Sequence, residues 1–303
     1  MRPVTTVSYL LMSVLVLGPQ PSDPGLAARI AGLLHTVITT DNESEERVAT
    51  AEARQQFLDR GLPTVADVGD EAAYEFVVLI CTYGPADVQV AVLTKAKRAV
   101  SRHELAPDAE RYCEARLRLD RVKARAAAHP PTNTALRDEI ERLYPTDQAV
   151  RQQKDFDSTR MQSVDREHAA ALQAILDRYG VPTYAMVGTS AAAHFVVLLQ
   201  HQAPELRTKA LPKLKRNVDA GQADPESYAM MYDRSRRDAG LKQRFGESLE
   251  CTPQNPTLHE AQIEDELHVN QRRADLGLIR IELYTQILIE TSPPICSALQ
   301  PGA

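Results

Sequence analysis

The sequence has no tryptophan, and aromatic residues make up only 5% of its 303 residues. Carbohydrate and nucleobase sites commonly use aromatic rings for stacking. This composition therefore argues against such a site, although ten tyrosines could supply some rings. Basic residues are also in the minority, because 35 Lys and Arg stand against 41 Asp and Glu and give a net charge of −6. Nucleic-acid binding usually requires a basic face, so we expect no nucleic-acid partner.

Long apolar runs are scarce, and the clearest one lies near the N-terminus. It extends from Val7 to Leu17 and is interrupted only by Ser8 and Ser13. A membrane-spanning helix needs about 20 apolar residues, so we expect no membrane span in the mature chain. The length fits the apolar region of a signal peptide, although no Ala-x-Ala cleavage motif follows. The alternative is a buried first helix or strand. We expect an exported or secreted protein; otherwise the protein is cytoplasmic.

Cysteines are few and widely spaced, at Cys81, Cys113, Cys251 and Cys296. None forms a Cys-x-x-Cys pair, so no zinc or redox motif is predicted. In an exported chain the most economical of the three connectivities joins Cys81 to Cys113 and Cys251 to Cys296. The alternative is that Cys81 is simply a small buried apolar residue, and the sequence alone slightly favours this.

Complete catalytic motifs are lacking as well. His259-Glu260 begins like a metalloprotease helix, but the second histidine is missing. Gly188-Thr-Ser190 lacks the second glycine of a nucleophile elbow. Glycine-rich phosphate-binding loops are absent too. We therefore expect no metal site and no cofactor.

What the sequence does contain is helical periodicity through most of its length. Residues 26–38, 43–60 and 86–102 have the composition and spacing of helices, and Pro107 sits where a first-turn proline belongs. Only the apolar run from Phe76 to Ile80 could equally be a buried strand. The predicted fold class is all-α.

The chain also contains an internal duplication. At an offset of 119 residues, Gly61–Pro85 and Gly180–Pro204 are identical at 13 of 25 positions. Both contain Gly-x-Pro-Thr, Val-Gly and Phe-Val-Val-Leu in that order. We predict two tandem, pseudo-symmetric multi-helix repeats packed into one helical body. The expected divisions are a signal peptide and linker over 1–24, a degenerate repeat over 25–131, a second helical domain over 132–292, and a disordered tail over 293–303.

The two copies differ mainly at polar positions. Gln200-His201-Gln202 in the second copy replaces Cys81-Thr82-Tyr83 in the first. Tyr232-Asp233-Arg234 likewise replaces a plainer segment. The shared positions are more simply explained as turn and core, so a functional site is expected in the second half.

Ordered motifs in this half carry a family resemblance. The matching segments are Asp147-Gln148-Ala-Val-Arg151, Val164-Asp165-Arg-Glu167, Gly180-Val-Pro182-Thr183, Val187-Gly188, Gln200-His201, Asp233-Arg234, Gly240-Leu-Lys-Gln243-Arg-Phe245-Gly246 and Arg272-Arg273-Ala-Asp-Leu-Gly277-Leu278. From about Leu136 to Tyr284 the sequence resembles an uncharacterised bacterial all-helical family, a domain of unknown function. The resemblance implies a helical fold and carries no activity.

Several residues depart from the family's pattern. The tryptophan of Gly-Trp-Pro-Thr is Val181 here, and the Ala-Asp that follows Gln-His is Gln202-Ala203. In Pro-Gln-x-Tyr-Gly-Thr-Gln, the tyrosine is Phe245 and Thr-Gln is Glu247-Ser248. If the family's polar residues form an active site, this chain has lost part of it.

The candidate site residues come from these motifs. Catalytic candidates are His201, Asp233 and Arg234; binding candidates are Gln200, Gln243, Arg272 and Arg273. A histidine at a helix C-terminus could act as a general base, and an arginine pair could hold a carboxylate or phosphate. The simpler interpretations are a structural histidine, a surface ion pair and a structural clamp.

Two functional hypotheses follow. The first is a non-enzymatic, exported helical module that binds a protein or peptide partner. The second is an enzyme, such as a hydrolase, with a polar pocket around His201, Asp233 and Arg234. Convergence of the candidate side chains in one pocket would favour the enzyme, because acid–base roles need hydrogen-bond reach.

Overall fold

The computed structural model describes residues 20–152, 157–252, 255–260 and 262–291, and helices dominate its regular structure. The all-α prediction is confirmed. The expected signal peptide and the expected tail, with Cys296, lie outside the described residues, apart from the linker around Gln20–Pro24. Within the described part of the chain, no helix combines the length and the apolarity needed to cross a bilayer.

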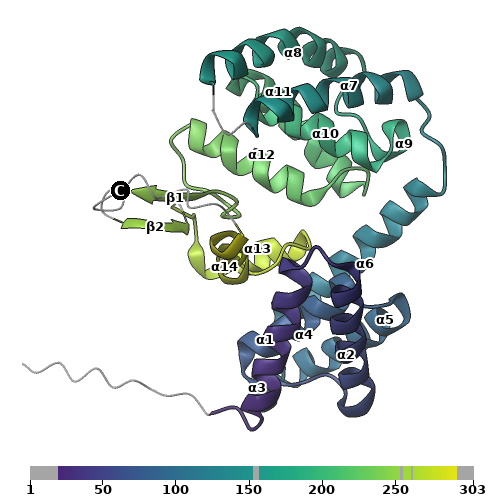
Figure 1. Cartoon of the computed structure of the whole chain (residues 1–303), viewed down its shortest axis with the longest axis vertical. Coiled ribbons are helices and arrows are strands. Elements are labelled where there is room, and N and C mark those ends of the chain that lie inside the picture. Colours follow the sequence, from purple (N-terminus) through teal and green to yellow (C-terminus); the bar gives the residue numbers. More distant parts are fainter. Residues whose placement is uncertain (1–19, 153–156, 253–254, 261, 292–303) are drawn as a thin grey trace, which may run out of the picture.

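The helices fall into two successive groups, followed by a smaller C-terminal set (Figure 1). The first group comprises α1 (Pro24–Thr39), α2 (Glu43–Arg60), α3 (Val65–Val68), α4 (Asp70–Tyr83), α5 (Ala86–Ser101) and α6 (Pro107–Ala127). The second comprises α7 (Thr134–Arg151), α8 (Ser158–Arg178), α9 (Tyr184–Val187), α10 (Thr189–Gln200), α11 (Pro204–Asp219) and α12 (Pro225–Asp238). The last set comprises β1 (Leu249–Thr252), β2 (Asn255–Glu260), the 3-10 turn η1 (Glu266–His268), α13 (Val269–Asp275) and α14 (Ile281–Thr291).

Each helical group has its own hydrophobic core, and α6 contributes to both. Cys113 and Leu117 of α6 belong to the first core, whereas Val122 and Ala126, further along the helix, pack against the second. Helix α13 packs on α6 and adds Ala274 to the first core. The two groups are therefore joined by a continuous helix that packs against both cores, and α13 and α14 lie at their junction (Figure 1).

The two duplicated segments adopt the same local geometry. Thr64 and Thr183 each cap a one-turn helix, α3 or α9. Gly69 and Gly188 then open α4 and α10 with φ values of 85° and 84°, in the left-handed region that glycine tolerates best. The ambiguous run from Phe76 to Ile80 is helical within α4. The symmetry of the two whole repeats stays a prediction.

One element is not expected from the sequence. Strands β1 and β2 form a two-stranded antiparallel sheet in which Leu249 pairs with Glu260. Their segment follows the second helical group, and Pro256 within it is incompatible with a regular helix interior. A short hairpin of this kind leaves the all-α class unchanged.

A disulfide joins Cys81 of α4 to Cys113 of α6 inside the first core. The sequence slightly favoured an unpaired Cys81; in the structure the residue is fully buried and also cross-linked. Helices α4 and α6 are adjacent, so their buried faces bring the two cysteines together, and this contact is not visible from spacing alone. The other expected disulfide, Cys251–Cys296, lies outside the described residues, because neither the side chain of Cys251 nor any part of Cys296 is described.

Reduction of this disulfide is expected to lower the free energy of unfolding by about 3–4 kcal/mol, because it cross-links residues 32 apart and restricts the unfolded chain. Denaturation with and without reductant measures the change. The Cys81→Ala/Cys113→Ala variant is the control, since its midpoint should not respond to reductant. Equal midpoints for oxidised and reduced wild-type protein would contradict the prediction.

Candidate functional site

The centre of the candidate site is the segment Gln243–Ser248, which follows α12 and has no helical structure. Asp233 of α12 lies beneath it and is fully buried. The Asp233 carboxylate accepts hydrogen bonds from the backbone N–H groups of Arg244 (2.7 Å), Phe245 (3.1 Å) and Glu247 (3.0 Å). Burial raises the pKa of Asp233, and these backbone N–H groups partly oppose that rise. The carboxylate thus anchors the segment.

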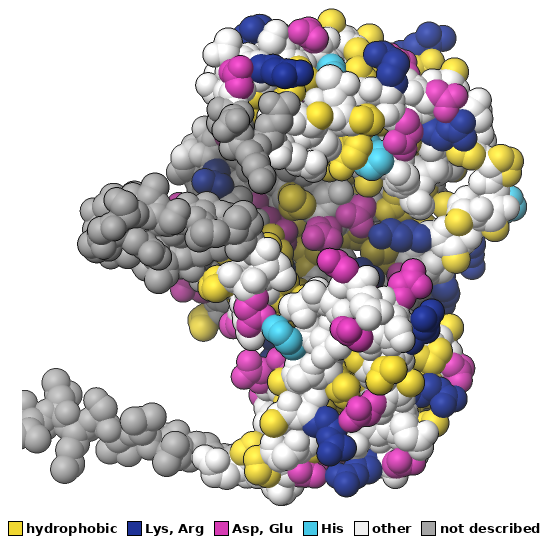
Figure 2. Space-filling view, in the orientation of Figure 1, with side chains coloured by type: hydrophobic (Ala, Val, Ile, Leu, Met, Phe, Trp, Pro, Cys, Tyr) yellow, Lys and Arg dark blue, Asp and Glu magenta, His cyan; other side chains and the backbone are white. Residues whose placement is uncertain are grey.

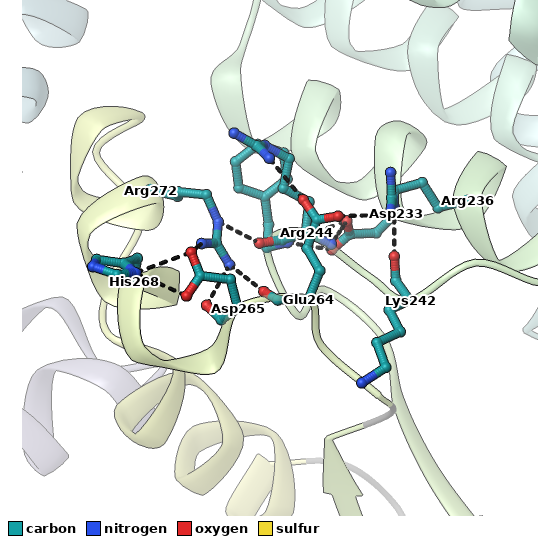
Figure 3. Close-up of polar contacts among 9 residues, drawn as sticks. Asp233, Arg236, Lys242, Arg244, Glu264, Asp265, His268 and Arg272 are labelled. Atoms are coloured by element: carbon teal, nitrogen blue, oxygen red, sulfur yellow. Dashed lines mark hydrogen bonds and ion pairs between the residues drawn. The ribbon is translucent and has the colours of Figure 1, made fainter.

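Three other sequence candidates also hold this segment in place: Gln243 from within it, and Arg272 and Arg273 from α13. Gln243 donates to the Ser248 carbonyl (2.9 Å) and accepts from the Ser248 N–H (2.8 Å). Arg272 donates to the carbonyls of Arg244 (3.0 Å) and Glu264 (2.7 Å), as Figure 3 shows. Arg273 donates to the Phe245 carbonyl (2.6 Å). Both arginines thus bind backbone carbonyls of this segment.

Gly246 makes this tight packing sterically feasible. Its φ is 75°, and a Cβ atom at this position would lie 2.1 Å from Cδ1 of Ile281. A side chain here would therefore clash with α14 as well as strain the backbone. The segment passes close to α14 because residue 246 is glycine.

The anchored segment buries the side chain of Glu247. Its Oε1 pairs with Arg273 Nη1 at 2.8 Å, and both side chains are 1% exposed. Its Oε2 is buried and has no hydrogen-bond partner among the described residues. Burial raises the pKa of Glu247 to about 7, although the Arg273 charge opposes this. The carboxyl group therefore takes up a proton at a higher pH than an ordinary glutamate does. Sequence reasoning noticed this residue only as a departure from a family motif.

Glu247 lines a cavity of about 420 Å³ between the end of α10, α12 and the anchored segment. The other lining residues are Gln200, Met230, Arg234, Arg237, Asp238 and Ser248. We call this the arginine cavity. Two of the sequence candidates, Gln200 and Arg234, thus meet in one cavity, and Arg237, which the sequence did not single out, joins them one helical turn after Arg234.

Some charged residues of the arginine cavity form ion pairs and others do not. Asp238 is in an ion pair with Arg207, whose guanidinium also donates to the carbonyls of Gln200 and Gln202. Within the described chain, neither Arg234 nor Arg237 forms an ion pair or a side-chain hydrogen bond. Burial and then the neighbouring Arg207 charge lower the pKa of Arg234. The cavity therefore presents two guanidinium groups that form no ion pair with described residues, although the Asp238 charge acts on Arg234.

His201, the first catalytic candidate, lies outside the lining of this cavity. Its Nδ1 contacts both carboxylate oxygens of Asp147, at 3.0 and 2.9 Å. Asp147 is fully buried and also pairs with Arg151 at 2.9 Å. A carboxylate can only accept, so Nδ1 carries the proton and Nε2 is left as the basic nitrogen. Asp147 was a motif residue in the sequence, but its partner is 54 residues away and only the fold reveals it.

Of the pocket predicted around His201, Asp233 and Arg234, only Arg234 lines the arginine cavity. Asp233 binds backbone, and His201 binds Asp147. His194, on the same helix as Gln200, pairs with Glu141 at 2.9 Å and stacks on Tyr144. No group of three or more histidine, cysteine or acidic side chains in the described residues could hold a metal ion.

The anchoring role of Asp233 gives a stability prediction. Asp233→Asn should lower the free energy of unfolding by about 1–3 kcal/mol, because an amide nitrogen would face buried N–H donors. Asp219→Asn is the matched control: Asp219 is an exposed acid paired only with Lys215, and we expect a change within about 0.5 kcal/mol. Urea denaturation measures both. Equal effects of the two substitutions would contradict the prediction that the buried Asp233 carboxylate stabilises the fold more than an exposed acid does.

Comparison with known proteins places this site within a family. No curated protein and no solved structure matches the chain. The model of a family of unknown function, DUF6624, matches residues 134–293, which include the His201–Asp147 pair, the arginine cavity and the anchored segment. Because this match covers more than half of the chain, the protein belongs to the DUF6624 family of unknown function.

Proposed function

We propose that the protein is a helical binding module that holds a peptide by its carboxylate group in the arginine cavity. The observation that carries this is the pair of unpaired guanidinium groups, Arg234 and Arg237, one turn apart on α12. Arginine is well suited to planar, bidentate recognition of carboxylates. Two such groups that form no ion pair with described residues favour binding of an anion in this cavity.

The neutral groups of the cavity support the same proposal. Gln200 is 7% exposed, and its side chain forms no hydrogen bond with other described residues. A buried amide needs a partner, and a peptide can supply both a donor and an acceptor. Met230 adds an adaptable apolar wall. The volume of about 420 Å³ is within the usual range of ligand sites.

Glu247 gives the proposed site a pH dependence. Below its pKa of about 7 the carboxyl group is neutral, so it does not repel the ligand carboxylate. Above that pKa the ionised group repels the ligand. Binding should therefore be stronger on the acidic side of pH 7 and weaken as the pH rises through about 7.

The test uses N-acetyl-trialanine, which has a free carboxylate, and its C-terminal amide, which has none. The acid should bind and the amide should bind at least about tenfold more weakly. Arg234→Gln and Arg237→Gln should each weaken binding of the acid about tenfold, which corresponds to about 1.4 kcal/mol. Calorimetric titration measures all of these, and added salt should weaken binding of the acid.

Arg216→Gln is the matched control, because Arg216 is an exposed arginine on α11 outside the arginine cavity. It should bind the acid like the wild type. Equal binding of acid and amide, or equal losses for Arg216→Gln and Arg234→Gln, would contradict the proposal.

The His201–Asp147 pair supports a second candidate function, hydrolysis. A histidine oriented through Nδ1 by a buried carboxylate has its Nε2 free to act as a general base. The same titrations distinguish the two functions if the peptide is analysed afterwards by mass spectrometry. An intact peptide supports binding alone. Cleavage that is lost in His201→Asn, with binding retained, would favour the enzyme.

We also propose that the protein is exported. The apolar run from Val7 to Leu17 and the Cys81–Cys113 disulfide support this, because disulfides persist mainly in oxidising compartments. N-terminal sequencing of the protein from its native source should give a first residue beyond Leu17. A soluble protein with Met1 intact and Cys81 reduced would contradict export.

A further inference from the structure

A second, larger cavity of about 730 Å³ lies where α4, α6 and α14 begin. It shares no lining residue with the arginine cavity, and residues of η1 and α13 complete its wall. Figure 1 shows α13 and α14 between the two helical groups. We call it the acidic cavity, because five of its lining residues are acidic and two are arginines.

Both arginines of the acidic cavity are already paired. Arg280 contacts Asp70 at 2.6 Å and Asp108 at 2.6 Å, and its guanidinium lies over the Tyr74 ring at 4.2 Å. Arg111 pairs at 2.9 Å with Asp275, which is not part of the lining. The negative charge that remains belongs to Glu71, Glu75 and Glu282.

The helix dipole explains why most of these acidic residues are favourable at their positions, but it does not explain Glu75. Asp70, Glu71, Asp108 and Glu282 lie in the first turns of their helices, where the N-terminal end of the dipole favours a negative charge. Glu75 is the sixth residue of α4 and lies beyond that turn. It is 7% exposed, lines the cavity and forms no hydrogen bond or ion pair with any described residue. An unpaired carboxyl that is so deeply buried destabilises the fold unless something in the cavity compensates it.

We propose that the acidic cavity binds the ammonium group of an aliphatic amine between Glu71 and Glu75. The two residues are four apart on α4 and therefore lie on the same face. Tyr74, Leu267 and Leu283 supply apolar surface for a hydrocarbon chain. A metal ion fits less well, since the described residues contain no group of three or more acidic, histidine or cysteine side chains able to hold one.

The ionisation of Glu75 adds a second signature. Burial, and then repulsion from Glu71, raises the pKa of Glu75 to about 7. The other charged groups that line the cavity are Asp70, Asp108, Arg111, Arg280 and Glu282. Because a cation favours the ionised form, amine binding should strengthen as the pH rises through about 7 and weaken as it falls.

The experiment is a calorimetric titration of the full chain with 1,5-diaminopentane on the alkaline side of pH 7. Binding at about 1 mM or tighter is expected, and 1-pentanol, which has no charge, should bind at least about tenfold more weakly. Magnesium chloride is the third probe and should not bind at this site. No binding of the diamine, equal binding of the alcohol, or displacement of the diamine by magnesium would overturn the proposal.

Substitutions test whether the diamine binds at Glu75. Glu75→Gln should weaken diamine binding at least about tenfold and abolish its pH dependence. Glu114→Gln is the matched control, an exposed acid on α6 that pairs with Lys97 outside the cavity. Glu75→Gln should fold, because it removes a group whose ionisation opposes folding as the pH rises from about 4.5 to about 7. A folded Glu75→Gln protein, verified by circular dichroism, that binds like the wild type would also overturn the proposal.

Discussion

The second half of the molecule depends on one buried carboxylate, that of Asp233. The residues after α12 have no helix or long strand to satisfy their backbone, so their N–H groups need other acceptors. Asp233 supplies these from within the helix, and Arg272 and Arg273 supply donors for the carbonyls on the other side. The result is a non-helical segment with a fixed path. That path brings Glu247 and Ser248 to the arginine cavity, so the site is a consequence of how the backbone is satisfied.

The first helical group is connected to the second through α6. Because this helix packs against both cores, it fixes the position of one group of helices relative to the other. Glu247 also lines a smaller cavity of about 230 Å³ that includes Tyr83 and Arg116 of the first half. Figure 2 shows acidic and basic side chains in the hollow between the two groups. The first helical group thus forms part of the surroundings of Glu247, which its sequence did not suggest.

Much of the fold could be predicted because its causes are local. Helical periodicity, first-turn prolines and the glycines that open α4 and α10 each act within a few residues. The residues of the candidate site were harder to predict from the sequence. Neighbouring residues in a helix do not share the same surroundings, because their side chains point about 100° apart. Asp233 therefore faces the buried segment while Arg234 faces the cavity, and Gln200 and His201 separate likewise. Glu247 and Asp147 could not be assigned from sequence, since their importance comes from partners distant in the chain.

Each of the two cavities is lined by one buried carboxyl group, Glu75 or Glu247. The pKa of each is raised to about 7, so each contributes stability below its unfolded pKa of about 4.5 that is lost as the pH rises through about 7. Packing alone gives no reason to place such groups in a core, because an apolar residue of similar size would avoid this loss. Their cavities supply a reason: the neutral form of Glu247 suits an anion held by Arg234 and Arg237, and the ionised form of Glu75 suits a cation. The two sites should therefore respond to pH with opposite signs, so pH alone separates their ligands.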